Sequence, residues 1–307
     1  MISRSTVIGG LVVVELAIAG AALGVFATPI VAPPLFWHPM APVAADAGPL
    51  LNKSFIAGPA PHVVVSVPGI PVTVEAGTSP TVQVTETLVR RGWVIGTPSR
   101  LDAEQTPDGV RIHNLDVGQL NVLLLGSIDH SLRVTVPPGA RVELATEDAI
   151  TVRGLRAKLV AHTRDGRVNV TDQQGDVDVA TDSGRIYLTD VQGTAIDAVS
   201  HDGRIYLARV GADRLAVHSD SGRIIGTGVR AADGGITTAD GRIEVSFTAS
   251  SDATASVRSH DGRITVTGFP FTSDGEERGT ARFGEGRGHF EVSTGDGHVT
   301  ITQGANG

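Results

Sequence analysis

The sequence of 307 residues contains no cysteine. This excludes a disulfide scaffold, a thiolate metal site and a cysteine nucleophile, and it leaves the redox compartment undetermined. Aromatic residues make up only 4% of the chain, whereas glycine is abundant, with 38 residues. That combination suits thin stacked β-coils, which have little room for large rings. The net charge is −8. General nucleic-acid binding requires an excess of basic residues, so we expect no nucleic-acid partner.

Motifs of common enzyme and cofactor sites are also missing. The chain has no HExxH, GxSxG or P-loop pattern, and the glycine-rich stretch 284–288 lacks the strand-to-helix context of a nucleotide site. The nonapeptide pattern of calcium-binding β-helices is absent. His201 and His260 share a position in the repeat described below but lie three coils apart, about 14 Å at the usual strand spacing. We therefore expect no catalytic residues, no cofactor and no metal.

What the sequence does contain is a repeated pattern, Ser/Thr-x-Asp/Ser-Gly-Arg/His-Ile/Val, between Ala140 and Ile301. Apolar residues recur seven and five positions before each glycine and two and four positions after it, and a small hydroxyl residue stands three before it. This period-2 alternation on both sides predicts two half-buried strands joined by a turn. We expect glycine in the turn because tight turns often need positive φ. The seven glycines are Gly166, Gly184, Gly203, Gly222, Gly241, Gly262 and Gly297.

Most copies lie about 19 residues apart, although the last two separations are 21 and 35 residues. One such unit cannot bury its own apolar face, whereas stacked units can, so the sequence predicts an all-β, repetitive β-solenoid. A degenerate eighth copy opens the series at Val142–Val152. The hydroxyl residues could bond the turn backbone or form a ladder along the stack. The pattern leaves open whether each coil has two strands or three.

Residues 1–28 are predicted to form an N-terminal transmembrane anchor. The run from Thr6 to Ala27 is apolar except for Glu15 and is long enough to cross a bilayer as a helix. Arg4 precedes the run and no Lys or Arg follows it before Lys53, so the positive-inside rule places the N-terminus in the cytoplasm and the β domain outside. The expected location is the cell membrane, with a single pass. A cleaved signal peptide ending at residue 27 is the alternative.

The predicted helix carries residues that could contact a partner helix. Intramembrane acids such as Glu15 usually face protein, and Gly20 and Gly24 form a GxxxG face. The alternative is that Glu15 is a tolerated acid and that the glycine spacing arises by chance in an Ala/Gly-rich helix.

Three regions follow the anchor. Residues 29–60 hold seven of the sixteen prolines and are predicted to be an extended Pro/Ala-rich linker. In residues 61–139 apolar and polar residues alternate, but no clear repeat is present. This region is predicted to be a β cap on the solenoid, with a hairpin at Asp108-Gly109. Residues 140–303 are the solenoid repeats, and the polar segment 272–287 is predicted to be an inserted loop or hairpin.

The candidate binding surface is a series of outward-facing residues just after the turn glycines. Arginine follows six of the seven glycines, and Arg185, Arg204, Arg223 and Arg242 lie in consecutive coils. One interpretation is a structural ladder in which each arginine balances a nearby turn aspartate; the other is a stripe that binds anionic polymer through bidentate contacts. Three positions after the glycine stand Tyr187, Tyr206 and Ile225. They form either a stabilising ladder or an exposed patch for a sugar or a protein.

The segment Leu132–Ala140, followed by the tandem Ser/Thr-x-Asp-Gly-x-Ile copies, resembles a bacterial family of β-strand-repeat proteins labelled "putative adhesin". The resemblance covers residues 61–303 and implies an extracytoplasmic all-β module, often placed behind a membrane anchor. It supplies no catalytic residues. The expected function is therefore non-enzymatic binding or scaffolding at the cell envelope, with an envelope polymer, an anionic glycan or a protein as partner. The alternatives are a carbohydrate-active β-helix enzyme, which would need a carboxylate pair in a groove outside the turns, and a component of an envelope-stress sensor.

Overall fold

The computed structural model describes residues 47–95, 100–115 and 123–304. These residues form strands, turns and bends, and none of them forms a helix that could span a membrane. The apolar run 6–27, with Glu15, Gly20 and Gly24, lies outside the described residues, so the predicted anchor and its helix contacts stay predictions.

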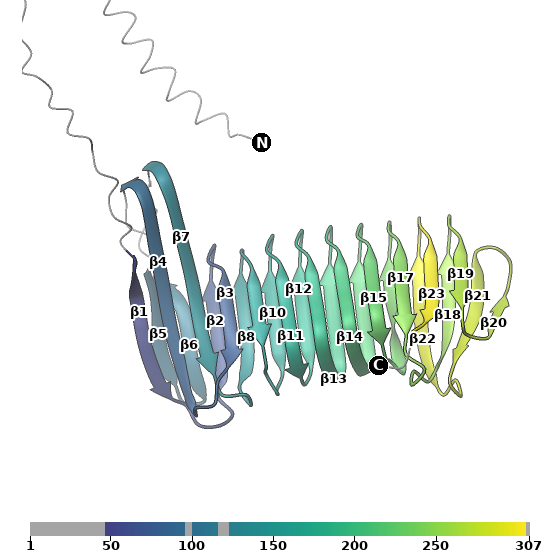
Figure 1. Ribbon diagram of the computed structural model, residues 1–307, viewed down its shortest axis with the longest axis horizontal. Helices are drawn as coiled ribbons and strands as arrows, with labels where there is room; N and C mark the ends of the chain where they lie inside the picture. Colours follow the sequence, from purple (N-terminus) through teal and green to yellow (C-terminus); the bar gives the residue numbers. More distant parts are fainter. Residues whose placement is uncertain (1–46, 96–99, 116–122, 305–307) are drawn as a thin grey trace, which may run out of the picture. The chain divides into compact units, whose positions relative to one another are not determined.

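The described part of the chain consists of β-strands (Figure 1). In chain order they are β1 (Ala47–Ile56), β2 (His62–Val67), β3 (Val72–Ala76), β4 (Thr81–Ile95), β5 (Arg100–Thr106), β6 (Gly109–Leu115), β7 (Leu123–Val136), β8 (Arg141–Thr146), β9 (Ile150–Arg153), β10 (Leu159–Thr163), β11 (Val168–Gln174), β12 (Val177–Thr181), β13 (Ile186–Ser200), β14 (Ile205–Ser219), β15 (Ile224–Val229), β16 (Asp233–Thr238), β17 (Ile243–Phe247), β18 (Ala253–Ser259), β19 (Ile264–Thr267), β20 (Phe271–Ser273), β21 (Arg278–Phe283), β22 (Gly288–Thr294) and β23 (Val299–Gln303).

The strands build a solenoid with two long parallel faces, and in seven of the coils the chain crosses from one face to the other at a turn glycine. Face 1 holds the strands before the turns, in the order β6, β2, β8, β10, β12, the end of β13, the end of β14, β16, β22 and β18. Face 2 holds the strands after the turns, in the order β7, β3, β9, β11, the start of β13, the start of β14, β15, β17, β23 and β19. Each coil therefore has two main strands. A short run at 191–193 also pairs with 210–212 where the chain crosses back from face 2 to face 1.

The alternation predicted from the sequence matches the burial along these strands. In β14, for example, Ile205 and Leu207 face the core and are 0% and 2% exposed, whereas Tyr206 between them faces outward. The degenerate eighth copy is a true coil, formed by β8 and β9 with Val142, Leu144, Ile150 and Val152 buried. Stacking gives one continuous apolar core through the solenoid.

The N-terminal region differs from the predicted cap in two ways. β2 and β3 form a regular coil that lies between the β6–β7 and β8–β9 coils, so stacking order differs from chain order. The capping strands are instead β5, which pairs antiparallel with β6, and β4, which pairs antiparallel with β7 and carries β1 on its other edge. The last part of the predicted linker, residues 47–56, is strand β1. The hairpin at Asp108-Gly109 is confirmed as the turn between β5 and β6.

The C-terminal end also stacks out of chain order. The coil of β22 and β23, around Gly297, lies between the β16–β17 coil and the β18–β19 coil. The segment predicted as an insertion forms the hairpin of β20 and β21, and β21 pairs antiparallel with β18. Phe247, Phe269, Phe283 and Phe290 fill this end of the core, with neighbouring ring centroids 4.4–5.4 Å apart.

The edge opposite the glycine turns has its own backbone requirement. Asp172, Asp190 and Arg209 occupy the same place in consecutive coils, and their φ angles are 54°, 55° and 53°. Left-handed backbone is unfavourable for residues other than glycine, and aspartate tolerates it better than most. Arg209 Nε lies 2.5 Å from Asp190 Oδ1, and hydrogen bonds from this guanidinium lower the pKa of the Asp190 carboxyl. The pair joins two neighbouring coils at this corner.

Candidate functional site

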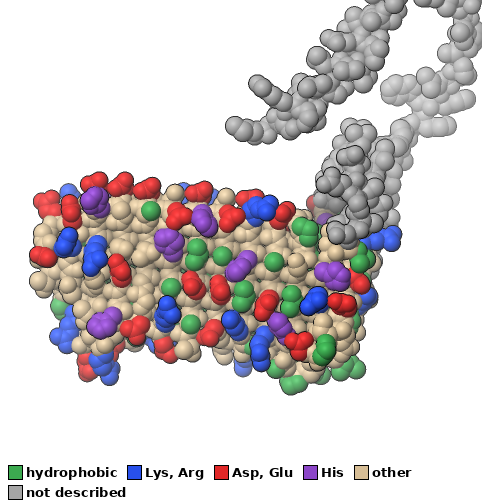
Figure 2. All heavy atoms as spheres, turned by 180° about the vertical axis from the view of Figure 1, so that it is seen from behind, with side chains coloured by type: hydrophobic (Ala, Val, Ile, Leu, Met, Phe, Trp, Pro, Cys, Tyr) green, Lys and Arg blue, Asp and Glu red, His purple; other side chains and the backbone are tan. Residues whose placement is uncertain are grey.

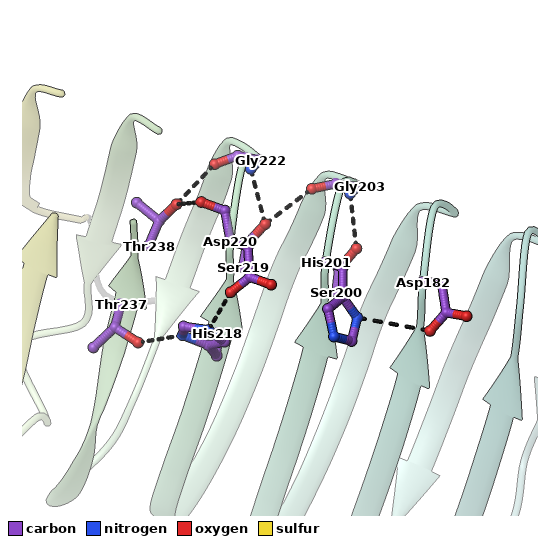
Figure 3. A network of polar contacts seen from close by, with 10 residues as sticks. All are labelled: Asp182, Ser200, His201, Gly203, His218, Ser219, Asp220, Gly222, Thr237 and Thr238. Carbon is purple, nitrogen blue, oxygen red and sulfur yellow. Dashed lines mark hydrogen bonds and ion pairs between the residues drawn. The ribbon is translucent and has the colours of Figure 1, made fainter. Parts of the chain in front are cut away.

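The candidate site lies on the edge formed by the glycine turns, and buried hydroxyl groups hold this edge together. Ser219 Oγ accepts a hydrogen bond from Gly222 N–H at 3.0 Å and donates to the carbonyl oxygen of Gly203 in the neighbouring coil at 3.2 Å (Figure 3). The hydroxyls thus bond the turn backbone, the first of the two arrangements expected from the sequence. Residues at this place are all buried: Thr163, Thr181, Ser200, Ser219, Thr238, Ser259 and Thr294.

The turn glycines are needed for a different reason from the one predicted. None of the seven has positive φ, so the expectation of a left-handed turn was wrong. A Cβ added at Gly203 would collide with the carbonyl oxygen of Gly184 and with the hydroxyl of Ser200. Gly222 and Gly262 meet the carbonyl oxygen of the adjacent turn in the same way. Glycine is therefore required because the turns stack backbone against backbone.

Directly after these glycines, the structure places Arg185, Arg204, Arg223 and Arg242 outward and exposed. The strands that follow them are paired in register along face 2. Neighbouring arginines therefore start from backbones about 4.8 Å apart. The structure thus brings the predicted stripe together as one row on the turn edge.

Two of the carboxylates near this row pair with histidine side chains. Asp182 pairs with His201 at 3.6 Å and Asp220 pairs with His218 at 2.9 Å (Figure 3). In the described structure, Arg185, Arg204 and Arg223 form no side-chain ion pair, and Arg242 contacts Glu244 on its own coil at 3.4 Å. The predicted ladder of paired aspartates and arginines is thus not formed at contact distance.

A shallow groove of about 620 Å³ runs across the stripe. Arg204, Arg223 and Arg242 line it together with His298 and three aspartates, Asp202, Asp240 and Asp296. The aspartates belong to the turns of Arg204, Arg242 and His298, whereas the turn of Arg223 has Ser221 in that place. Positive charge is therefore least balanced at Arg223, in the middle of the groove.

The second candidate group forms a stack on face 2. The rings of Tyr187 and Tyr206 lie parallel, with centroids 4.7 Å apart and planes 4° apart. The guanidinium carbon of Arg167 lies 5.4 Å from the centroid of Tyr187, and Ile225 continues the row in the next coil. Both tyrosines are half-buried. The ladder arrangement is present, and the outer edges of the rings face solvent.

Face 1 carries a group that the sequence reasoning missed. Asp178 and Asp197 stand opposite each other on neighbouring strands in a small groove of about 210 Å³ that Lys158 and Arg214 also line. Burial against neighbouring groups and repulsion by Asp178 raise the pKa of Asp197. The signal was available, because both aspartates stand six positions before their turn glycines.

Figure 2 shows the molecule from behind the view of Figure 1, with acidic, basic and histidine side chains interspersed over the side in view. Within the described residues, no group of three or more His, Asp or Glu side chains is placed to hold a metal ion.

These features define the class: an all-β, repetitive protein of adhesin-like fold. The chain belongs to the Toastrack DUF4097 family, whose model matches residues 110–302. This confirms the resemblance drawn from the repeats. The chain matches none of the curated proteins with which it was compared.

Solved bacterial structures give further matches, each at 10% identity. A putative adhesin from Parabacteroides merdae matches over 82% of this chain and 95% of its own, with a TM-score of 0.45. A putative adhesin from Bacteroides fragilis matches over 82% and 96%, with a TM-score of 0.38. A putative cell adhesion protein from Clostridium sporogenes matches over 83% and 100%, with a TM-score of 0.25.

Proposed function

We propose that this protein is a non-enzymatic binding or scaffolding module of the cell envelope that holds anionic polymer along the arginine stripe. The observation that carries the proposal is the row of exposed arginines without ion pairs at Arg185, Arg204 and Arg223. A guanidinium binds carboxylate, phosphate or sulfate groups through two parallel hydrogen bonds. A row of them at strand spacing offers repeated contacts to a chain of such groups.

The distribution of histidines supports this proposal. In the coils of Arg185 and Arg223 the residue before the glycine is serine, and the aspartate one step earlier pairs with a histidine. The nearby negative charge is thereby engaged away from the arginines. An anionic ligand would supply the missing partner.

The test replaces Arg185, Arg204 and Arg223 together with Gln and measures retention on a dextran sulfate column. We expect the variant to remain folded and to lose most of its retention, and wild-type retention to weaken as salt rises, because exposed charges are screened. The matched control replaces Arg111, Arg141 and Arg156, which are exposed elsewhere, and changes the net charge equally. If both triple variants lose the same amount of retention, net charge alone explains the binding, and the arginine stripe is not a specific site.

The tyrosine stack is separated by a further variant, Tyr187→Ser with Tyr206→Ser. Retention that persists at high salt and disappears in this variant would assign binding to the rings rather than to the arginines, because stacking is not screened by salt.

We also propose that residues 6–27 anchor the module in the cell membrane with the β domain outside. The length of the apolar run and the position of Arg4 support this topology. Sequencing the N-terminus of the mature protein tests it, and a chain that starts at Thr28 would show a cleaved signal peptide instead. A component of an envelope-stress sensor would share this topology.

A carbohydrate-active enzyme is a second candidate because Asp178 and Asp197 form a carboxylate pair in a groove outside the turns. Glycosidases use two carboxyl groups, one of them with a raised pKa, and the pKa of Asp197 is raised. The groove of about 210 Å³ is, however, smaller than the roughly 300–1,000 Å³ of typical ligand sites. Release of reducing sugar from envelope polysaccharide that Asp178→Asn abolishes would favour the enzyme, and no release from any glycan would remove it.

A further inference from the structure

The two faces of the solenoid end differently at their outer edges. At the N-terminal end of the stack, β5 covers β6 and β4 covers β7. At the other end, β21 covers β18 on face 1. On face 2 the terminal strand β19 pairs with β23 on its inner side, and no described strand pairs with its outer edge. Open strand edges are usually covered, because they present unpaired hydrogen-bonding groups.

A backbone hydrogen-bond series along face 2 stops at this open edge. The N–H two residues after each turn glycine donates to the carbonyl one residue after the glycine in the next coil. Val168 donates to Arg185 at 2.9 Å, and the series continues coil by coil to Val299, which donates to Arg263 at 3.0 Å. Ile264 is next in line, and its N–H has no acceptor among the described residues. Unpaired backbone groups at a sheet edge favour the addition of another strand.

Side-chain burial points to the same edge. Val299 and Ile301 in the adjacent coil are 0% exposed, whereas Ile264 and Val266, at the same places in the terminal coil, are half-buried. The two core-facing side chains of β19 are therefore incompletely covered. A further strand would cover them as each inner coil covers its neighbour.

A groove of about 590 Å³ lies beside this edge. Ile264 and Arg263 line it from the last coil, and Phe271, Ser273 and Glu276 line it from the hairpin. β20, like β19, has one edge without a described partner, since it pairs with β21 alone. The groove is therefore bordered by two strands, and its lining combines the apolar side chains of Ile264 and Phe271 with the charged side chains of Asp261, Arg263 and Glu276.

We propose that this groove receives a single extended polypeptide strand from a partner protein, which pairs in parallel with β19. The recognised segment carries apolar residues at alternate positions, to cover Ile264, Val266 and Phe271, and the carbonyl that precedes the first of them accepts the N–H of Ile264. A second copy of this chain fits less well. The β20–β21 hairpin extends past β19 at this end of the stack (Figure 1), and the opposite end is closed by β4 and β5.

The chain itself supplies a probe for this site. Within the fold, the segment His298–Gln303 pairs with β17 so that Ile243 lies opposite Val299 and donates its N–H to the carbonyl of His298. A synthetic peptide of this sequence can offer the same carbonyl to Ile264. In its negative control the amide of Thr300, which faces the preceding strand in a parallel ladder, is methylated.

The experiment measures binding of the fluorescent peptide to the full-length protein by anisotropy. We expect saturable binding by the wild type, and about tenfold weaker binding of the methylated peptide, because a lost hydrogen bond costs up to about one decade in affinity. The N–H of Val266 faces the open edge and does not bond β23, so Val266→Pro removes a hydrogen bond to the peptide but none within the fold. Edge strands tolerate proline at such positions. We expect this variant to bind the peptide about as weakly as the wild type binds the methylated peptide. Ser273→Trp, which narrows the groove from the hairpin, gives a second variant if the proline perturbs folding.

The matched control is Thr265→Ala, which alters an exposed side chain of the same strand and should bind as the wild type does. Absence of saturable binding, or binding that ignores the methylation and both groove variants, would overturn the proposal. Self-association of the wild type that Val266→Pro abolishes would also overturn it, because it would assign the edge to a second copy. The arginine stripe is intact in all these variants, so their retention on dextran sulfate reports on the proposed function independently.

Discussion

Removing the hydroxyl of Ser219 tests how the turn edge is held together. Ser219 is 0% exposed, and its Oγ joins Gly222 N–H of its own turn to the carbonyl oxygen of Gly203 in the preceding turn. Ser219→Ala leaves a buried donor and a buried acceptor without this partner. A buried group that loses its hydrogen bond costs about 1–3 kcal/mol, and the carbonyl can compensate more easily than the N–H, so we expect a loss of about 2–4 kcal/mol.

The assay is thermal unfolding followed by circular dichroism. For a domain of this size, 1 kcal/mol corresponds to about 2–4 °C, so Ser219→Ala should lower Tm by about 4–16 °C. Two controls isolate the hydroxyl. Ser219→Thr keeps it, in the form already used at Thr181 and Thr238, and Ser221→Ala removes an exposed hydroxyl from the same turn. Both should melt within a few degrees of the wild type, since neither breaks the bridge.

Amide hydrogen exchange adds a local measurement. The N–H of Gly222 should exchange faster in Ser219→Ala, because its acceptor is gone, while amides several coils away should be unaffected. Two results together would show that the account of the turn edge is wrong: equal melting temperatures of Ser219→Ala and Ser221→Ala, and an unchanged exchange rate of the Gly222 amide. The hydroxyl bridge would then contribute nothing measurable to stability.

Two further predictions concern burial and charge. Ile205→Asp should unfold the solenoid, because an unpaired buried charge costs several kcal/mol, whereas Tyr206→Ser should lose only a ring stack of about 0.5–1.5 kcal/mol; comparable melting temperatures would contradict the assignment of faces. The pKa of Asp197 is raised above its ordinary 3.8 in the folded state, so its ionisation opposes folding at neutral pH, and this penalty disappears as pH falls below that value. Asp197→Asn should therefore be more stable than wild type in urea unfolding at pH 7, with the difference fading toward pH 4. A difference that does not change with pH would contradict this account.

The parity of the repeat was sufficient to place the core. The alternation around each glycine assigned Ile205 inward and Tyr206 outward, and it located the degenerate coil at Val142–Val152, because a period of two admits one buried face. The role of the turn glycines was not accessible in this way. A required positive φ and a close backbone approach select the same residue, and only the packing of Gly203 against the Gly184 carbonyl distinguishes them.

The sequence predicted the position of the candidate site but not the side-chain contacts within it. Sequence alternation placed the arginines in one outward row, but it could not say which carboxylates reach them. The pairing of Asp182 with His201 and of Asp220 with His218 depends on side-chain directions across neighbouring coils. The left-handed corner at Asp172, Asp190 and Arg209 was missed because the residues there share a backbone conformation rather than a residue type.

The stacking order at the two ends follows from what the capping segments can cover. Every coil presents nearly the same edge to its neighbours, so pairing alone does not determine which coil lies beside which. A hairpin, however, can pair only with a strand that has a free outer edge. β21 covers β18, so the β18–β19 coil must be outermost and the later β22–β23 coil must lie inside it. At the other end β5 and β4 cover β6 and β7, which places the earlier β2–β3 coil inside in the same way. The separations between the last turn glycines are irregular, at 21 and 35 residues, because a capping hairpin lies between the outermost coil and the β22–β23 coil, which returns to an inner position in the stack. The same arrangement leaves the outer edge of β19 exposed at the end of the solenoid.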